Sequence, residues 1–152
     1  MYIGGIDLLK NLKPRLQEPE VQELLSYAVF PDPEQVNQTV QQYVTQSNLF
    51  LTGYEDEEQL VGLIGYEHTG ASEITIRHIA VLPENRFKNY GRGMISQLLA
   101  EYNPDTLIAE TDQEAIEFYR NTGFVVYSLG ELYPGVERFR CVLEKEEDED
   151  DV

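Results

Sequence analysis

The sequence predicts a domain of the α/β (α+β) class, in which helices come first and a mixed sheet of about six to seven strands follows. Two observations support this prediction. In the N-terminal third, apolar residues recur at intervals of three and four, as on one face of a helix. From Leu49 onward they form short runs separated by Gly, Pro and acidic residues, as in strands joined by turns.

Three helical segments are expected before residue 49. The first covers residues 8–12 and is limited by Pro14, and the second covers residues 21–28. The third begins at Asp32, a typical N-cap residue, and Pro33 then occupies the first helical position.

Two strands follow as a hairpin. Leu49–Tyr54 and Leu60–His68 flank the acidic turn 55–58, and Gly70 closes the second strand.

The next strand, Glu73–Leu82, changes phase. Its apolar residues are even-numbered up to position 76 and odd-numbered from position 79, and a regular strand cannot place both sets on one face. A β-bulge near Arg77 and His78 would restore the phase. The alternative is a strand that is buried on both faces.

The stretch from Ile79 to Gly93 has the build of an anion-binding site. An apolar strand runs into a basic turn, and a helix is expected over Gly91–Ala100. Arg86, Lys88 and Arg92 fall within seven positions, although the whole chain has only 11 Lys and Arg residues. Free N–H groups and the positive end of the dipole at a helix N-terminus attract anions such as phosphates.

In the C-terminal part, the sequence pattern predicts one more helix between strands. A strand over Thr106–Glu110 leads into a capping box at Thr111–Glu114, and the helix that follows should end at Gly123. Phe124–Leu129 and Val136–Leu143 are the last two strands.

Composition and charge exclude several classes of protein. The net charge of −17 opposes general nucleic-acid binding, because phosphate backbones would be repelled by most of the surface. The single cysteine, Cys141, cannot form an internal disulfide, and no Cys/His cluster has metal-binding spacing. The N-terminus lacks a basic region followed by a long apolar stretch, and nowhere do about 18 apolar residues run together, as a membrane span would need. We therefore expect a cytoplasmic protein without a metal.

Two segments resemble the signatures of the GCN5-related N-acetyltransferase (GNAT) superfamily. Arg86-Phe-Lys-Asn89-Tyr-Gly91 is similar to its acetyl-CoA motif, in which Arg or Gln is followed by two residues, Gly, one residue, and Gly or Ala. Asn89 stands at the first glycine, and Asn is among the few other residues that tolerate a positive φ. In the second segment, Phe118-Tyr119 precedes Gly123-Phe124 at the spacing of the other family signature.

The resemblance implies a GNAT-like fold of the small bacterial type. Its mixed, largely antiparallel sheet of about six to seven strands would be flanked by about four helices and splayed at the bulged fourth strand. A single domain would cover residues 1–143. Residues 144–152 would be an acidic tail, since residues 144–151 hold seven acids against one lysine, and such runs are typically disordered.

The resemblance also implies acetyl-CoA as cosubstrate. Backbone N–H groups of Phe87–Arg92 would hold the pyrophosphate, with charge from the three basic residues, one of which could serve the 3′-phosphate. The backbone at Ile79–Val81 would pair with the pantetheine arm while the side chains of Ile79 and Val81 stay in the core. The full set of expected cofactor residues is Ile79, Ala80, Val81, Arg86, Phe87, Lys88, Asn89, Tyr90, Gly91, Arg92 and Asp112. Asp112 stands where relatives have an Asn on the cofactor arm, although it could cap a helix instead.

For catalysis, Tyr119 occupies the position of the family's general acid, and the alternative is that it only packs beside Phe118. Glu73 and His78 are the possible general bases, and a water chain is the alternative to both. The acceptor side could be lined by Glu67, His68, Tyr27 and Tyr133.

The sequence thus predicts an acetyl-CoA-dependent N-acetyltransferase that moves an acetyl group directly to a primary amine. An acidic surface favours a cationic small-molecule or peptide acceptor, and the chain would be a monomer or homodimer. Two alternatives remain: a noncatalytic acyl-CoA-binding or regulatory module, and an unrelated nucleotide-binding protein with the same kind of turn, for which no GxxxxGK[ST] loop is present.

Overall fold

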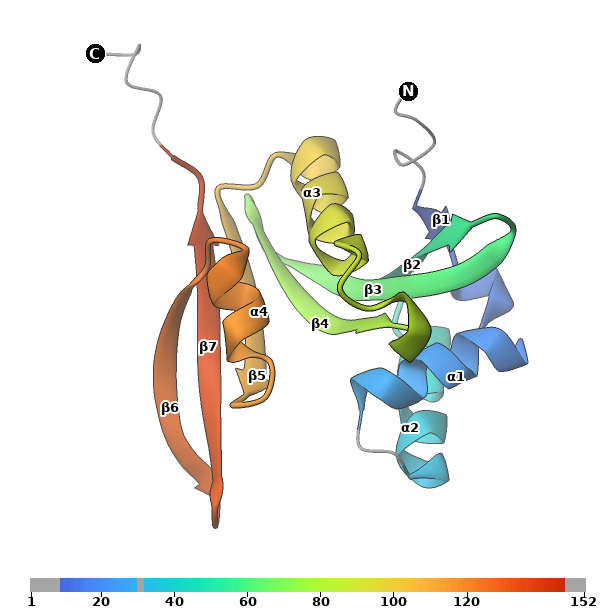
Figure 1. The fold of residues 1–152 in the computed structure, drawn as a ribbon, viewed down its shortest axis with the longest axis horizontal. Helices are drawn as coiled ribbons and strands as arrows, with labels where there is room; N and C mark the ends of the chain where they lie inside the picture. The colour runs from blue at the N-terminus through green and yellow to red at the C-terminus, as the bar shows by residue number, and fades with distance from the viewer. Residues whose placement is uncertain (1–8, 30–31, 147–152) are drawn as a thin grey trace. The chain divides into compact units, whose positions relative to one another are not determined.

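Figure 1 shows the computed structural model, which describes residues 9–29 and 32–146. The chain divides into two compact units. The first comprises the described parts of residues 1–67 together with Arg77–Tyr102, and the second comprises His68–Ile76 together with the described part of residues 103–152.

Seven strands follow the order β1-β2-β3-β4-β5-β7-β6, and four α-helices accompany them in the described chain. β4 and β5 pair in parallel, whereas the pairs β1–β2, β2–β3, β5–β7 and β6–β7 are antiparallel. The predicted fold class, a mixed and largely antiparallel sheet with four helices, is confirmed. The strands are β1 Lys10–Asn11, β2 Leu49–Asp56, β3 Gln59–Gly70, β4 Glu73–Val81, β5 Thr106–Asp112, β6 Val125–Tyr133 and β7 Val136–Glu144, and the helices are α1 Pro19–Ala28, α2 Pro33–Thr45, α3 Tyr90–Tyr102 and α4 Ile116–Asn121.

In the first unit, helices lie on both sides of β3 (Figure 1). A Cβ atom at Gly62 would lie 3.0 Å from Met94 of α3, and one at Gly65 would lie 1.8 Å from the hydroxyl of Tyr43 on α2. Because successive residues of a strand face opposite sides, the even and odd positions of β3 meet different helices. β3 is buried from Leu60 to Tyr66 for this reason.

The core of this unit is an apolar cluster between α1, α2 and the sheet. Its buried members are Leu12, Leu16, Val21, Leu24, Leu25, Val40, Tyr43, Leu49, Leu51, Leu60, Leu63, Ala80 and Leu82. The predicted start of α2 is confirmed, because the Asp32 side chain accepts a hydrogen bond from the Glu34 N–H (3.1 Å).

The helix expected over residues 8–12 is wrong within the described residues. Lys10 and Asn11 form β1 and pair with Gly53 and Thr52 of β2. The leucine spacing that suggested a helix instead places Leu12 in the core, where it is fully buried. Pairing along the free edge of β2 outweighs the weak local preference of so short a segment.

The side chains of β4 differ in part from the prediction. Ile79 and Val81 are only half-buried, whereas Ala80 between them is buried, so the expectation that both belong to the core is wrong. Ile74 and Ile76 are also buried. The three most buried residues of β4, at positions 74, 76 and 80, are thus all even-numbered. The bulge near Arg77 and His78 stays a prediction.

In the second unit, α4 packs against β6 and β7, and a Tyr119–Phe124 ring contact (5.2 Å between centroids) joins the helix to the start of β6. The predicted capping box is wrong: Thr111 and Asp112 belong to β5, and α4 begins only at Ile116, after Ala115 as its cap. β7 extends the pairing of β5 to Asp112 and so draws these residues into the sheet. Gly123 ends the helix as expected, with a φ of 106°.

The predicted tail begins one residue too early, because Glu144 still pairs with Thr106 at the end of β7. Residues 147–152 lie outside the described part of the chain. No helix among the described residues is long and apolar enough to cross a membrane.

The close approach of Tyr43 to β3 makes a specific prediction about stability. Gly65→Ala should lower the free energy of unfolding by about 1–3 kcal/mol, because the new methyl group would overlap the Tyr43 hydroxyl and overpack the core. Gly93→Ala is the matched control. Apart from its chain neighbours and the backbone of its own helix, no atom lies within 4 Å of a Cβ at this position, so that change should be neutral or stabilising by about 0.5–1 kcal/mol. Urea unfolding of both variants would decide, and an equal response at the two glycines would contradict the packing described for Tyr43.

Candidate active site

The turn between β4 and α3 has an unusual backbone. After a single 3-10 turn at Pro83–Asn85, Phe87 and Asn89 have φ values of 65° and 67°. Positive φ is uncommon outside glycine and especially so for a bulky residue such as Phe. Asn89 thus adopts the left-handed backbone that was expected where the family motif has glycine.

Arg86 anchors the N-terminal side of this turn. Its Nε atom donates to the Val81 carbonyl (3.1 Å), and its guanidinium lies 5.5 Å from the ring centroid of Tyr27. A guanidinium stacks well on an aromatic face and can still carry a hydrogen bond at its edge. Arg86 therefore holds the turn against β4 and α1 in addition to contributing charge.

Tyr90 anchors the other side. Its hydroxyl donates to Asp56 Oδ2 (2.7 Å), and its ring lies 5.4 Å from that of Tyr54 between centroids. The hydrogen bond to Asp56 raises the pKa of Tyr90 to about 12. Both Tyr54 and Asp56 belong to β2, so the first residue of α3 is fixed to the hairpin.

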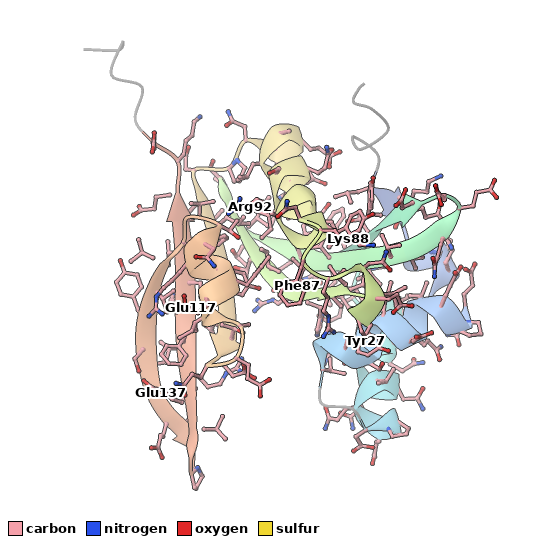
Figure 2. The ribbon with its side chains drawn as sticks, viewed as in Figure 1. Tyr27, Phe87, Lys88, Arg92, Glu117 and Glu137 are labelled. Atoms are coloured by element: carbon pink, nitrogen blue, oxygen red, sulfur yellow. The ribbon has the colours of Figure 1, made fainter. Side chains whose placement is uncertain are left out.

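The start of α3 offers donors for an anion. The Gly93 N–H donates to the Asn89 carbonyl (2.9 Å), and the N–H groups of Tyr90–Arg92 precede this first turn. Figure 2 shows Phe87, Lys88 and Arg92 around the helix start, and all three side chains are exposed. Backbone N–H groups with nearby cations are the donor set that suits a pyrophosphate.

Gly91 is buried, and the strand leading into the turn is held from the β3 side, where the Leu82 N–H donates to the Val61 carbonyl (2.9 Å). The first unit therefore brings together ten of the predicted cofactor residues, from Ile79 to Arg92.

His78 is half-buried in the same unit. Its Nδ1 atom lies 2.6 Å from the hydroxyl of Tyr43, and the two rings are 5.5 Å apart between centroids. Burial, and secondarily the neighbouring Arg77 charge, lower the pKa of His78 to about 4. Burial likewise raises the pKa of Tyr43 above its ordinary value. The pair is therefore neutral near pH 7.

The other acidic and basic candidates are engaged in contacts. Glu73 accepts a hydrogen bond from the Thr69 hydroxyl (2.6 Å) in the second unit. In the first unit, Glu67 forms an ion pair with Arg77 and also accepts from Asn48 (2.6 Å), which gives it a structural role. The side chain of Tyr133 lies outside the described residues.

Tyr119 and Asp112 belong to the second unit. Tyr119 is 4% exposed between the rings of Phe118 and Phe124, and burial raises the pKa of its hydroxyl. Asp112 Oδ1 accepts from the Glu114 N–H (3.0 Å), so its carboxylate stabilises the turn before α4. Asp112 therefore caps a backbone N–H, as the alternative to cofactor binding expected. The capped N–H belongs to the turn before α4 and not to the helix itself.

Comparison with known proteins decides the family. The acetyltransferase (GNAT) domain family matches residues 14–133 of this chain. The chain belongs to the GNAT acetyltransferase family. An N-acetyltransferase of Bacillus methanolicus that is itself uncharacterised is 32% identical over 84 residues, which are 55% of this chain and 70% of that protein.

Solved structures agree with the GNAT fold. A protein from Desulfovibrio desulfuricans that is assigned to the GNAT family has a TM-score of 0.77 at 17% identity and covers 90% of this chain and 98% of its own. An aminoglycoside 6′-N-acetyltransferase in complex with coenzyme A has a TM-score of 0.70 at 15% identity, over 93% and 99% of the two chains. At such identities the likeness shows the fold alone.

Two features of this GNAT chain escaped the sequence analysis. The Tyr43–His78 contact joins residues 35 positions apart, and Gly65 makes room for it. Gly65 was a signal for this contact, but not a specific one. A glycine inside an apolar strand often marks the close approach of another group, without showing which group it is. The anchoring role of Arg86 has no such signal, because it depends on where Tyr27 comes to lie.

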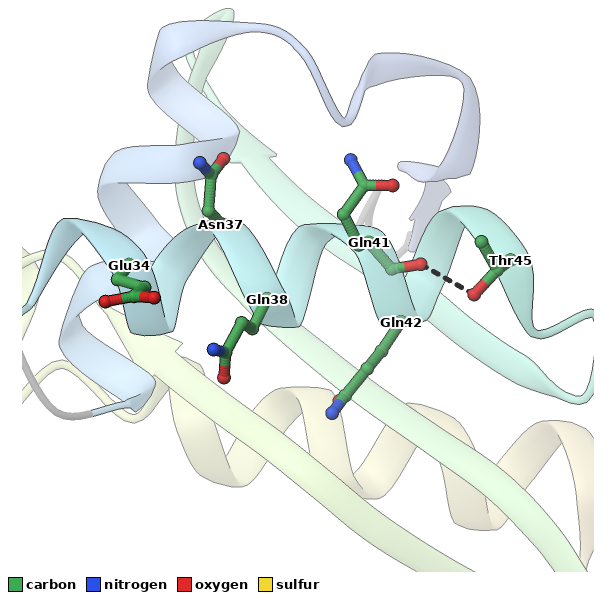
Figure 3. Close-up of a pocket in the computed structure, with 6 residues that line it drawn as sticks. All are labelled: Glu34, Asn37, Gln38, Gln41, Gln42 and Thr45. Carbon is green, nitrogen blue, oxygen red and sulfur yellow. Dashed lines mark hydrogen bonds between the residues drawn. The ribbon is translucent and has the colours of Figure 1, made fainter.

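A shallow hollow on α2 is separate from this site (Figure 3). Only polar side chains of one helix line it, and Thr45 donates to the Gln41 carbonyl (2.8 Å) at one end. Its lining residues are Glu34, Asn37, Gln38, Gln41, Gln42 and Thr45. Within the residues that the structure describes, no group of His, Cys, Asp and Glu is placed to hold a metal ion.

The lowered pKa of His78 predicts a pH dependence of stability. In the unfolded chain the imidazole takes up a proton near pH 6.5, whereas in the folded chain it does so near pH 4. The contribution of His78 to the free energy of unfolding should therefore be fully present above pH 6.5. It should be lost as the pH falls from 6.5 to 4, and the loss should be about 3 kcal/mol at most.

Unfolding free energies of the wild type and His78→Gln from pH 4 to pH 7 would test this. The difference between the two curves isolates His78 from the carboxylates, which are common to both. His68→Gln changes the only other histidine and should keep the wild-type decline. Parallel curves for wild type and His78→Gln would show that His78 titrates alike in both states.

Proposed function

We propose that this chain is an acetyl-CoA-dependent N-acetyltransferase that transfers an acetyl group directly to a primary amine. The observation that supports this most is the left-handed backbone of Asn89 at the start of α3. It retains the loop geometry of the family motif despite the loss of its first glycine, in a chain that belongs to the GNAT family. This favours a working cofactor loop over a degenerate one.

In this proposal, acetyl-CoA supplies an activated thioester, and residues of the first unit hold the rest of the molecule. The N–H groups of Phe87–Arg92 bind the pyrophosphate, and Lys88 and Arg92 add charge at the helix start. The backbone of Ile79–Val81 pairs with the pantetheine arm as an additional strand would.

Proton transfer requires an acid and a base. Tyr119 is proposed to protonate the departing thiolate, as the matching family position suggests. Glu73 is a better candidate for the base than His78, because the Nδ1 atom of His78 is engaged by Tyr43 and its lowered pKa makes it a weak proton acceptor. A water chain remains the alternative to both.

The proposed acceptor is a cationic amine. The net charge of −17 attracts cations over a distance, and one structural neighbour is an aminoglycoside N-acetyltransferase. The single-domain organisation over residues 1–143 and the cytoplasmic location stay predictions.

Two measurements test the proposal in sequence. Calorimetry with coenzyme A should detect binding at a single site, and its absence would reject the cofactor assignment. Acetyl transfer from acetyl-CoA should then be measured against a panel of polyamines, aminoglycosides, amino compounds and peptides. Binding without turnover of any amine would favour a noncatalytic acyl-CoA-binding module.

Lys88 provides a specific test of the loop. Lys88→Glu should weaken coenzyme A binding by about tenfold or more at low salt and by less at high salt, because it places a negative charge beside the pyrophosphate. Lys145→Glu makes the same change of charge at an exposed lysine after β7 and is the control. If both variants bind coenzyme A equally well in calorimetry, the phosphates do not lie at this turn.

Tyr119 provides a test of the chemistry. Tyr119→Phe keeps the ring contacts with Phe118 and Phe124 but removes the proton, so kcat should fall by about 10²-fold or more while coenzyme A affinity is nearly unchanged. Steady-state kinetics with the best acceptor, combined with calorimetry, separates the two effects. Unchanged kcat would assign the residue to packing alone.

A further inference from the structure

Phe87, in the turn between β4 and α3, is the most exposed large hydrophobic residue of the described chain. Its exposed fraction is 103%, whereas the other exposed large hydrophobic residues lie between 38% and 60%. A single exposed apolar side chain is normal by itself, but Phe87 also has a φ of 65°, which is unusual for a bulky residue. The fold therefore holds an aromatic ring in solvent on a strained backbone.

The stability of the fold does not account for this residue. Because the ring of Phe87 is fully exposed, it removes no apolar surface from water. A glycine at the same position would adopt the positive φ without a steric cost. Strained residues of this kind cluster at binding sites, where a ligand makes use of them. A contact with a ligand is therefore the better explanation of the exposed ring.

The backbone on both sides of the ring is fixed. Arg86, directly before it, donates to the Val81 carbonyl (3.1 Å) and lies 5.5 Å from the ring centroid of Tyr27. Tyr90, three residues after it, donates to Asp56 (2.7 Å). A surface that is already ordered loses less entropy when a ligand packs on it. The turn thus presents its aromatic ring in advance of binding.

The surroundings of Phe87 indicate what the ligand is. Lys88 and Arg92 are also exposed around the start of α3, where the N–H groups of the first helical turn lie (Figure 2). Cations and N–H groups suit phosphates, and an exposed aromatic face suits a flat base. A nucleotide combines both groups in one molecule. A cationic amine, which could also use an aromatic face, would be repelled by the two neighbouring cations.

We propose that the ring of Phe87 stacks on the adenine of coenzyme A, so that this side chain binds the base while the N–H groups of the turn bind the pyrophosphate. The family motif leaves the position after Arg86 open, so the ring is a property of this chain and not of the motif. The inference rests on the proposed function, because it concerns the same cofactor.

Calorimetry of Phe87→Ala with three ligands tests the stack, with the two smaller ligands measured by displacement of coenzyme A. The affinities for coenzyme A and for adenosine 3′,5′-bisphosphate, which both contain adenine, should fall by about fivefold or more. The affinity for 4′-phosphopantetheine, which lacks adenine, should be unchanged. Phe87→Tyr keeps an aromatic face and is the matched control, with wild-type affinity for all three ligands.

The outcomes separate this inference from the proposed function. A wild type without affinity for coenzyme A would reject both. If coenzyme A binds the wild type and Phe87→Ala equally well, only the stack is rejected. An equal loss of affinity for 4′-phosphopantetheine would show that the side chain shapes the turn, which also overturns the stack. Removal of a fully exposed ring should leave the urea midpoint of unfolding unchanged, and a lower midpoint would assign the ring to packing.

A tryptophan at this position gives an independent readout, because the chain contains none of its own. The indole fluorescence of Phe87→Trp should be quenched by coenzyme A, since the base would stack on the indole, and should not respond to 4′-phosphopantetheine. Val44→Trp, at an exposed valine on α2, is the control and should keep its emission with both ligands. Emission from Phe87→Trp that stays constant at saturating coenzyme A would reject the stack.

Discussion

The backbone of the turn after β4 is the constraint on which the cofactor loop depends. Two residues with side chains, Phe87 and Asn89, hold positive φ values that are costly outside glycine. Such a conformation persists only where neighbouring contacts fix it. Arg86 provides them on one side, through Val81 and Tyr27, and Tyr90 on the other, through Asp56. Together they fix the start of α3, where the N–H groups of the first helical turn lie.

A second constraint lies in the same unit, where the polar groups of Tyr43 and His78 meet at the core. Tyr43 is fully buried, and its hydroxyl is satisfied by the Nδ1 atom of His78. A buried hydroxyl without a partner would be costly, so each of these residues fixes the position of the other. Gly65 is part of the same arrangement, since any side chain there would occupy the place of the hydroxyl. His78 is thereby better suited to organising β4 than to accepting a proton.

Local rules predicted those parts of the fold that local interactions determine. The Asp32 cap, the helix end at Gly123 and most of the strand positions follow from neighbours in the sequence, and the structure agrees. Lys10 and Thr111 were misassigned because strand pairing with distant residues decides their conformation. The proposed cofactor loop could be found by its motif. Its anchors could not, because they join it to residues 34 and 59 positions earlier in the chain, Asp56 and Tyr27.

Under the proposed function, the charge distribution of the chain has to suit two ligands of opposite sign. Coenzyme A is an anion and the proposed acceptor is a cation, yet the chain is strongly acidic. Screening resolves this conflict, because the Debye length at physiological ionic strength is about 8 Å. In the proposed complex, the N–H groups and Lys88 at the turn would act on a phosphate at contact distance, where the distant acids are screened. The field of those acids acts on an approaching amine outside the site. An acidic surface with one basic turn can therefore bind the anion locally while it favours the cation during encounter.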